Sequence, residues 1–342
     1  MPELYLQYAL RYLQGGLIMM SLPDFKYKQC IFYFPSDDKS KLRFRADNII
    51  IEDEEGKVVQ QHSCHLVFAL FIIGNITLTN VVLQKAKQFA FPVLLLSRNF
   101  RLDSYFNNRA EGNFLLRRKQ YDSGELNFLI ARELVTQKMN NQIALLQDLR
   151  YRAAPETEAI QKLNDLSLAG AQTAQELMGI EGNASKIFFP AYFRQMNWTR
   201  REPRTKRDVN NLLLDIGYTY LFHFVEAMTA IYGFDVYCGV FHTFFYQRKS
   251  LVCDLVEPFR CIIDLRLRKA HNLKQIDEKD FFQDNNQYQL AYKQQGKYTK
   301  MFVKDILDHK EDIFLYIQAY YRWFMKNKHL DDFPVFQIKG SD

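Results

Sequence analysis

Residues 126–146 read LNFLIARELVTQKMNNQIALL, and the spacing of their apolar side chains decides the fold class of the later part of the chain. Apolar residues recur there at steps of three and four, as one face of an α-helix requires: Leu126, Leu129, Ile130, Leu134, Ile143 and Leu146. The same period returns in a segment that starts near Asp208 and stops at Gly233, and again at residues 306–324. Polar residues 284–289 mark a loop between them. The sequence therefore predicts a mainly helical domain over residues 105–342.

The residues before about 104 follow a different pattern, with short β-rich runs separated by polar turns. Ile31-Phe32-Tyr33-Phe34 and Ile49-Ile50-Ile51 are two such runs, and residues 35–38 are typical of a turn. We expect residues 80–89 to form one helix that leads into a buried strand at residues 93–96. The fold class predicted is α+β, with an N-terminal extension (1–22), a small β-sheet domain (23–104) and a larger helical domain (105–342).

The bulk composition is that of a folded globular chain. Of its 342 residues, 48% are hydrophobic and 25% charged, which supplies enough apolar surface to offset the entropy of ordering the chain. The longest apolar run, residues 66–73, is too short for a bilayer, which needs roughly 20 residues, and the N-terminus lacks a signal-peptide pattern. The five cysteines are scattered without zinc-ribbon spacing, which fits a reducing compartment. We expect a cytoplasmic protein with no membrane segment.

Positive charge is concentrated in one segment of the chain. The formal net charge is +6, and residues 200–207 alone hold five basic residues against one acid. Such a segment would contact a phosphate backbone without reading its sequence, whereas the alternative is a solvated surface loop. The residues expected to bind DNA are Arg200, Arg201, Arg204, Lys206 and Arg207, with Arg248 as a further candidate.

Three segments place metal-capable side chains beside glycines or apolar neighbours. Glu181 lies in Gly179-Ile180-Glu181-Gly182, where the glycines leave it open to a ligand, although a capping glutamate at a helix start explains it as well. His242 can offer an imidazole nitrogen to a metal or carry a proton. The alternative is a hydrogen-bonded core histidine, which is what we expect of His223 within its periodic helix.

Asp254 and Glu257 make up the third segment, and they would share one face if a helix began there. The structural alternative is an acidic capping box, with Asp254 at the N-cap, Glu257 at the third helical position and Pro258 in the first turn. One imidazole and two or three carboxylates together suit Mg²⁺ or Mn²⁺ better than zinc, and such a site suits phosphate chemistry. Another cluster, His62-Ser63-Cys64-His65, lacks a second ligand pair, so we expect it to pack in the core.

In order and spacing, these segments resemble the CRISPR-associated spacer-acquisition integrase, the family called Cas-one. The glutamate motif is similar to residues 181–185 running into 188–189, the histidine motif to residues 239–242, and the acidic motif to residues 250–260 with Asp264 beyond. Residues 138–142 and 208–214 support the resemblance, which covers the chain from about residue 28 to the last helix. The chain departs from the family pattern at Asn183, Ser185 and Cys261 and in the prefix before residue 22, which leaves the CRISPR subtype open.

The resemblance implies a β-sheet domain used for homodimerisation and a helical catalytic domain, assembled as two dimers around a dimer of the small Cas-two partner. It implies an integrase that inserts short foreign DNA into the CRISPR array, in which a 3′-hydroxyl attacks a phosphodiester at the boundary of the double-stranded repeat. Glu181, His242 and Glu257 would bind Mg²⁺ or Mn²⁺, and Asp254 would support the site. Two alternatives stay open: a non-catalytic DNA-binding scaffold of the same fold, and a related nuclease of DNA repair or of a transposon.

Overall fold

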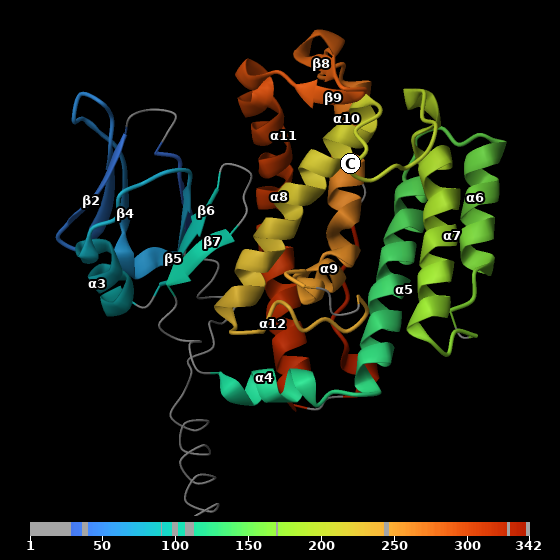
Figure 1. Ribbon diagram of the computed structural model, residues 1–342, viewed down its shortest axis with the longest axis horizontal. Helices are drawn as coiled ribbons and strands as arrows, with labels where there is room; N and C mark the ends of the chain where they lie inside the picture. Colours follow the sequence, from blue (N-terminus) through green and yellow to red (C-terminus); the bar gives the residue numbers. More distant parts are fainter. Residues whose placement is uncertain are drawn as a thin grey trace, which may run out of the picture. The chain divides into compact units, whose positions relative to one another are not determined.

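The computed structural model describes residues 29–35, 40–89, 91–97, 102–106, 113–168, 170–242, 246–326 and 329–339 (Figure 1). The chain divides into two compact units, one up to residue 112 and one from residue 113. Strands dominate the first unit and helices dominate the second, which confirms the α+β fold class predicted from the sequence. The predicted extension at residues 1–22 lies outside the described residues.

The first unit is built on two sheets. Its core sheet has the strand order β1-β5-β6-β7, in which β1, β5 and β6 run parallel and β7 is antiparallel to β6. The second sheet is antiparallel throughout, with the order β2-β3-β4. The strands are Gln29–Tyr33 (β1), Lys41–Arg45 (β2), Asn48–Glu52 (β3), Val58–Ser63 (β4), Val67–Ile73 (β5), Val93–Leu96 (β6) and Leu102–Phe106 (β7).

The long apolar run of the sequence forms the centre of the core sheet. Every residue of β5 is buried, as expected of a parallel strand that is covered on both faces. The helix α3 (Asn80–Phe89) connects β5 to β6 and buries Val82 and Ala86 in the same apolar cluster, so the helix and the strand predicted there are confirmed. Cys64 also packs in this cluster, as expected, whereas His65 is exposed.

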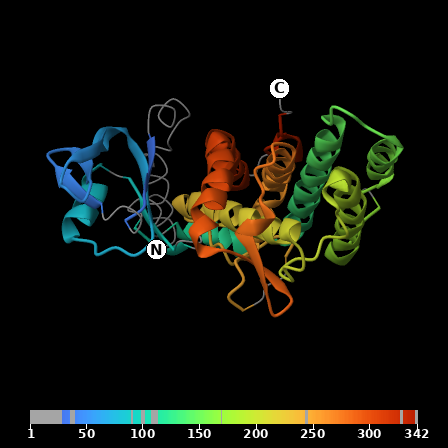
Figure 2. The ribbon, with the colours of Figure 1, turned by 90° about the horizontal axis from the view of Figure 1, so that it is seen from above.

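Helices form most of the second unit (Figures 1 and 2). The helices α5, α6 and α7 lie side by side, and α8 packs against α9, α10, α11 and α12. Their bounds are Phe114–Tyr121 (α4), Leu126–Gln147 (α5), Ala154–Asp165 (α6), Ala174–Tyr192 (α7), Val209–Ile231 (α8), Ser250–Leu255 (α9), Arg260–Asn272 (α10), Gln295–Asp308 (α11) and Lys310–Lys326 (α12). Within the described ranges, none of the helices is both long and apolar enough to cross a membrane.

The two long helices of this unit have the extents that the sequence predicts. α5 covers the periodic apolar segment at residues 126–146. α8 begins after Asp208, whose side chain accepts a hydrogen bond from Asn211 N at 2.8 Å, and ends before Gly233, where φ is +82°.

Two other predictions for this unit are wrong. Residues 306–324 do not form one helix, because the backbone leaves the helical region at His309 and separates α11 from α12. The polar stretch predicted as a loop forms a hairpin of β8 (Phe281–Asp284) and β9 (Gln287–Leu290). Its two turn residues, Asn285 and Asn286, both have positive φ, as a tight hairpin turn requires.

An extended C-terminal segment, residues 333–339, is held on α5 by two side-chain amides. Gln137 donates to and accepts from the backbone of residues 334–336, at 2.8 and 3.0 Å. Asn141, one turn further on, bonds in the same way to residues 336–338, at 3.1 and 2.8 Å. Asn141 Nδ2 also lies 3.0 Å from Pro258 O, to which it donates. Asn141 therefore ties both the C-terminal segment and the turn that carries Glu257 to α5.

Candidate active site

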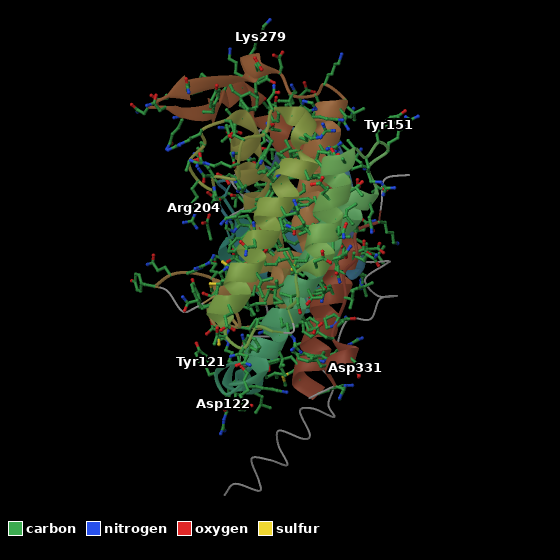
Figure 3. The ribbon with its side chains drawn as sticks, turned by 90° about the vertical axis from the view of Figure 1, so that its right-hand side faces the viewer. Tyr121, Asp122, Tyr151, Arg204, Lys279 and Asp331 are labelled. Atoms are coloured by element: carbon green, nitrogen blue, oxygen red, sulfur yellow. The ribbon has the colours of Figure 1, made fainter. Side chains whose placement is uncertain are left out.

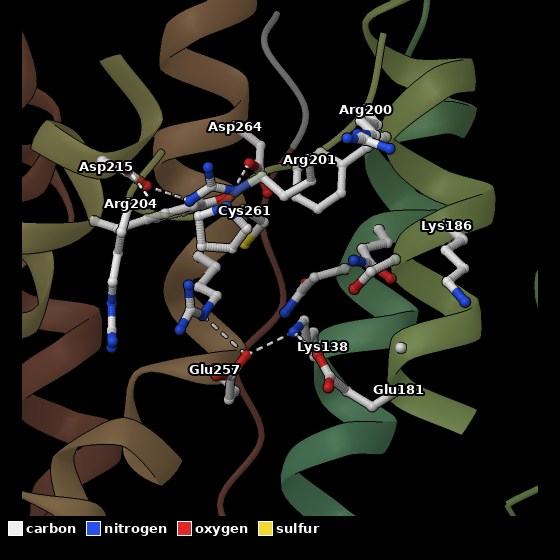
Figure 4. A pocket seen from close by; sticks show the side chains of 18 of the residues that line it. Lys138, Glu181, Lys186, Arg200, Arg201, Arg204, Asp215, Glu257, Cys261 and Asp264 are labelled. Atoms are coloured by element: carbon white, nitrogen blue, oxygen red, sulfur yellow. Dashed lines mark hydrogen bonds and ion pairs between the residues drawn. The ribbon is translucent and has the colours of Figure 1, made fainter. Parts of the chain in front are cut away.

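A cavity of about 1010 Å³ lies in the second unit between α5, α7, α8 and α10 (Figure 4). Its wall includes Glu181, His242 and Glu257, the three side chains expected to share a metal ion. Asp254, the fourth candidate, is fully buried and is not part of the wall. Three residues that are far apart along the chain thus lie around one cavity.

Glu181 projects from the middle of α7 and not from its start. The helix begins after Thr173, whose hydroxyl accepts from Glu176 N at 3.2 Å, so the interpretation of Glu181 as a capping residue is wrong. Gly179 and Gly182 lie within the helix, where an added Cβ would meet no atom within 4 Å. Gly182 lines the cavity, so its missing side chain leaves the wall beside Glu181 open.

Asp254 and Glu257 lie on opposite sides of a helix break. Asp254 is in the last turn of α9, and a single 3-10 turn, Glu257–Phe259, precedes α10. The predicted capping box is therefore wrong, because the two carboxylates do not begin the same helix. The break directs them to different partners: Glu257 faces the cavity, whereas Asp254 faces the loop that carries His242.

The Asp254 carboxylate holds His242 in place. It accepts from the backbone N–H groups of Val240 (2.7 Å), Phe241 (3.1 Å) and His242 (3.0 Å), and its Oδ1 lies 2.6 Å from His242 Nδ1. Because the Asp254 carboxylate oxygens accept from the neighbouring backbone N–H groups, we assign the Nδ1 proton of His242 to this contact, which leaves Nε2 to accept a proton or bind a cation. Asp254 is therefore a positioning residue. The other histidine considered, His223, bonds to the buried Glu226 at 2.9 Å, as a core histidine should.

A buried lysine joins the two glutamates. Lys138 Nζ hydrogen-bonds to Glu181 Oε1 and lies 2.8 Å from Glu257 Oε2 (Figure 4). Arg260 Nε lies 2.9 Å from the same Glu257 oxygen. Both contacts to Glu257 Oε2 are ion pairs. Burial raises the pKa of Glu257, but the pairs with Arg260 and Lys138 outweigh burial and lower the pKa to about 2.

A further buried carboxyl group, Asp264 of α10, also lines the cavity. It accepts a hydrogen bond from the Tyr218 hydroxyl, and the Tyr218 ring lies against the guanidinium groups of Arg260 (4.8 Å) and Arg201 (5.5 Å). Burial raises the pKa of Asp264 to about 6, although the Tyr218 hydrogen bond and the charge of Arg260 oppose the rise. Asp264 therefore takes up a proton at a far higher pH than Glu257 does.

Three of the five basic residues at 200–207 are engaged in ion pairs. Arg201 Nη2 lies 2.5 Å from Asp215 Oδ1, and the Arg201 side chain is only 15% exposed. Arg200 and Arg207 share the carboxylate of Glu202. Much of the charge predicted to be available to DNA is thus neutralised within the second unit, and Arg201 stabilises the segment itself.

Arg204 and Lys206 differ from these neighbours. Both line the cavity, both have positive φ (67° and 52°), and within the described part of the chain no ion pair or side-chain hydrogen bond engages either. Figure 3 shows Arg204 at the outer surface of the second unit. Together with the exposed Lys186, these cations face an anion that enters the cavity. Arg207 and Arg248 do not belong to the wall of the cavity.

No role was predicted for Lys138, Gln142 or Arg260, although all three belong to stretches that carry the family resemblance. Lys138 and Gln142 continue the buried face of α5, at steps of four residues from Ile130 and Leu134. A polar residue that interrupts an apolar helix face is the signal that could have identified them, because such side chains are rarely buried without a partner. Arg260 is the last residue of the acidic motif, and its spacing alone does not indicate that it pairs with Glu257.

The donors around the cavity fit a hard divalent cation. Carboxylate oxygens and one neutral imidazole nitrogen suit Mg²⁺ and Mn²⁺, and Glu257 Oε2 and Gln142 Oε1 are buried oxygens that accept no hydrogen bond. Among the residues described, no three His, Cys, Asp or Glu side chains stand close enough together to hold an ion. The ammonium group of Lys138 lies between the two glutamates instead.

Comparison with known proteins shows a match over most of the chain. The family model described as "CRISPR associated protein Cas1" matches residues 34–304. The protein named "CRISPR-associated endonuclease Cas1 1" of Thermodesulfovibrio yellowstonii is 30% identical over 274 residues, which cover 76% of this chain and 86% of the relative.

Solved structures share the fold of the chain. A structure described as "Partial Cas6-RT-Cas1--Cas2 complex" matches with a TM-score of 0.73 at 20% identity, covering 90% of this chain and 98% of the other. A structure described as "Casposase bound to integration product" matches with a TM-score of 0.65 at 18% identity, covering 88% and 92%. At these identities the likeness establishes a common fold.

Proposed function

Because the chain belongs to the CRISPR-associated Cas1 family, we propose that its cavity is the catalytic site at which this endonuclease breaks and joins DNA phosphodiester bonds. The chain is an integrase-type endonuclease of spacer acquisition, the insertion of short foreign DNA into a CRISPR array. The observation that carries the proposal is the convergence of Glu181, His242 and Glu257 on one cavity whose wall holds more basic than acidic side chains.

Glu181, His242 and Glu257 are proposed to hold a Mg²⁺ or Mn²⁺ ion. When bound, such an ion neutralises charge on the phosphoryl oxygens and activates the attacking hydroxyl. Glu257 offers an ionised carboxylate, because its pKa lies near 2. His242 offers Nε2, because Asp254 binds the opposite ring nitrogen and accepts from the backbone N–H groups of Phe241 and His242.

The reaction proposed for the cavity is a transesterification. The 3′-hydroxyl oxygen of the incoming DNA attacks a phosphorus atom at the repeat boundary, forms a new P–O bond and displaces the oxygen of the leaving strand. Because one P–O bond forms as another breaks, the number of phosphodiester bonds is unchanged. The attacking hydroxyl gives its proton to solvent, and the leaving oxygen takes one from solvent. Water as the attacker gives hydrolysis, which is the nuclease activity of the same site. Arg204, Lys206 and Lys186 would bind the phosphates that flank the reacting one.

The partners proposed are double-stranded DNA of the protospacer and the repeat, a second copy of the chain and a small Cas2 subunit. The β-sheet domain predicted at residues 23–104 would form the homodimer. A complex of Cas1 with Cas2 among the structural neighbours supports the second kind of subunit. We propose a cytoplasmic location, because these DNA substrates would be met there.

A strand-transfer assay with Mn²⁺ and a labelled repeat duplex tests this function. We expect wild-type protein to join donor DNA to the repeat, and Glu181→Ala or His242→Ala to lower the product by about a hundredfold or more while DNA binding persists. Glu158→Ala, which removes an exposed carboxylate outside the cavity, is the control and should form product as the wild type does. Normal product from Glu181→Ala would contradict the catalytic role given to this residue, and wild-type protein that binds DNA but forms no product would favour the non-catalytic scaffold.

A further inference from the structure

Lys138 is a buried cation on the α5 wall of the cavity. Its ammonium group hydrogen-bonds to Glu181 and lies 2.8 Å from Glu257 Oε2, so it stands between the two carboxylates proposed as metal ligands. The Lys138 and Glu257 side chains are 11% and 6% exposed. Water and salt therefore screen this contact far less than they screen a surface ion pair.

The position of this ammonium group follows from the cost of burying charge. Two adjacent carboxylates repel each other, and a buried one such as Glu257 is costly to remove from water unless a cation pairs with it. Lys138 supplies that cation to both glutamates, with Arg260 as a second partner of Glu257 alone. A divalent ion held by the same two carboxylates would need the space between them, and two cations cannot share it.

We propose that the Lys138 ammonium group holds the place of the divalent ion in the metal-free protein, so that metal binding exchanges one cation for the other. This rests on the proposed function, because it takes Glu181 and Glu257 as ligands. Lys138 is then a positioning residue. It keeps two like charges close together before the metal arrives, and it competes with the metal for them.

The displaced ammonium group needs a new anion. Among the described residues of the wall, the other two acids are already engaged, Asp215 with Arg201 and Asp264 with Tyr218. A DNA phosphate that enters the cavity is the anion that remains for Lys138. Metal and DNA should therefore bind cooperatively, each increasing the affinity for the other by the same factor.

Titration of metal-free protein with Mn²⁺, followed by the electron paramagnetic resonance signal of the free ion, tests the exchange. Lys138→Met removes the competing charge and keeps an unbranched apolar stem. We expect it to bind Mn²⁺ roughly tenfold or more tightly than wild type does. Lys138→Arg keeps a cation and should bind no more tightly than wild type. Lys162→Met removes an exposed charge outside the cavity and should leave the Kd unchanged.

The outcomes separate this inference from the proposed function. Neutral variants that bind Mn²⁺ no more tightly than wild type would overturn the exchange while leaving the metal site in place. A wild-type protein that binds no Mn²⁺ would overturn the metal site itself. Should Lys138→Met not fold without metal, Lys138→Gln replaces it, because the amide still donates to one carboxylate.

Two further measurements do not depend on activity. In EDTA, Lys138→Met should unfold at a lower temperature than wild type, and saturating Mn²⁺ should close that difference; a difference that Mn²⁺ leaves unchanged would contradict the exchange. A short DNA duplex should tighten Mn²⁺ binding by wild type more than by Lys138→Met. An equal effect of DNA on both proteins would overturn the transfer of the ammonium group to phosphate.

Discussion

Single residues of this site act largely by holding other residues. Asp254 is not part of the cavity wall, yet it binds the backbone of residues 240–242 and the Nδ1 atom of His242. Lys138 does the same for two glutamates. Support of this kind fixes the ligands before an ion or substrate arrives, and its loss typically costs ten- to a hundredfold in metal affinity or activity.

Gly239→Ala should disturb the loop that carries His242. The added Cβ would lie 2.8 Å from Asp254 Oδ2 and 2.6 Å from Ser250 Cβ, so either the loop or α9 must shift. We expect strand transfer to fall about ten- to a hundredfold. Gly179→Ala is the matched control, because its Cβ meets no atom within 4 Å and alanine stabilises a helix by up to about 1 kcal/mol. Full activity of Gly239→Ala would contradict the role given to this loop.

Asp264 makes the free energy of unfolding depend on pH. Burial raises its pKa from 3.8 to about 6, so its stabilising contribution is complete below about pH 4 and is lost as pH rises through 6. Asp264→Asn keeps an acceptor for Tyr218 and should remove this loss. The change in the free energy of unfolding between pH 4.5 and 7.5 should then shrink by roughly 2 kcal/mol. Urea denaturation at both pH values measures it, and an unchanged difference would show that Asp264 does not titrate in this range.

Among the elements, periodicity predicted helices that bury one continuous face and missed features decided by tertiary contacts. α5 and α8 were predicted because their apolar residues recur on one side. The break between α9 and α10 was not, because Asp254 and Glu257 satisfy the rules of a helix start equally well. The β8–β9 hairpin was missed because the polar run at residues 284–289, which holds its turn and most of β9, is equally typical of a loop.

The candidate site was predictable only in part. From spacing alone, a structural role explained Glu181, His242 and Glu257 as well as metal binding did. The family resemblance was what predicted that the three bind one ion. The structure gathers them around one cavity. Lys138 and Arg260 needed coordinates, because nothing local in a sequence shows which buried cation will meet which carboxylate after folding.

Phe336→Ala tests the C-terminal segment as an element of the site. Phe336 is 6% exposed and packs with its ring centroid 4.8 Å from that of Phe259, in the turn that begins with Glu257. We expect the free energy of unfolding to fall by about 3–5 kcal/mol, and strand transfer to fall with it. Val335→Ala is the control, because that side chain is 75% exposed and should change stability by less than about 0.5 kcal/mol. Equal stability of the two variants would show that the segment merely covers α5.

The molecule as a whole concentrates charge around one cavity. Seven basic and four acidic side chains line it, so its wall attracts a polyanion. The paired cations stabilise the fold, whereas Arg204 and Lys206 have no such partner within the described residues. Counting the basic residues of this segment therefore overstates how many side chains are available to bind DNA.

Arg204→Ala and Lys206→Ala should each weaken the binding of every DNA sequence alike. Each should also lower the slope of log affinity against log salt by about 1, because each removes one phosphate contact. Arg201→Ala should instead destabilise the fold by about 1–3 kcal/mol, because Asp215 loses its partner. Fluorescence anisotropy with two unrelated duplexes at several salt concentrations measures binding, and a loss confined to one duplex would contradict phosphate contact.

The measurement that bears most directly on the metal site is diffraction from a crystal of the wild-type protein soaked in Mn²⁺, at a wavelength where manganese scatters anomalously. We predict one anomalous peak in the cavity, within about 2.0–2.6 Å of oxygen atoms of Glu181 and Glu257 and of His242 Nε2, with Lys138 Nζ displaced. A peak bound elsewhere, or none at saturating Mn²⁺, would contradict the claim that these three residues form one metal centre.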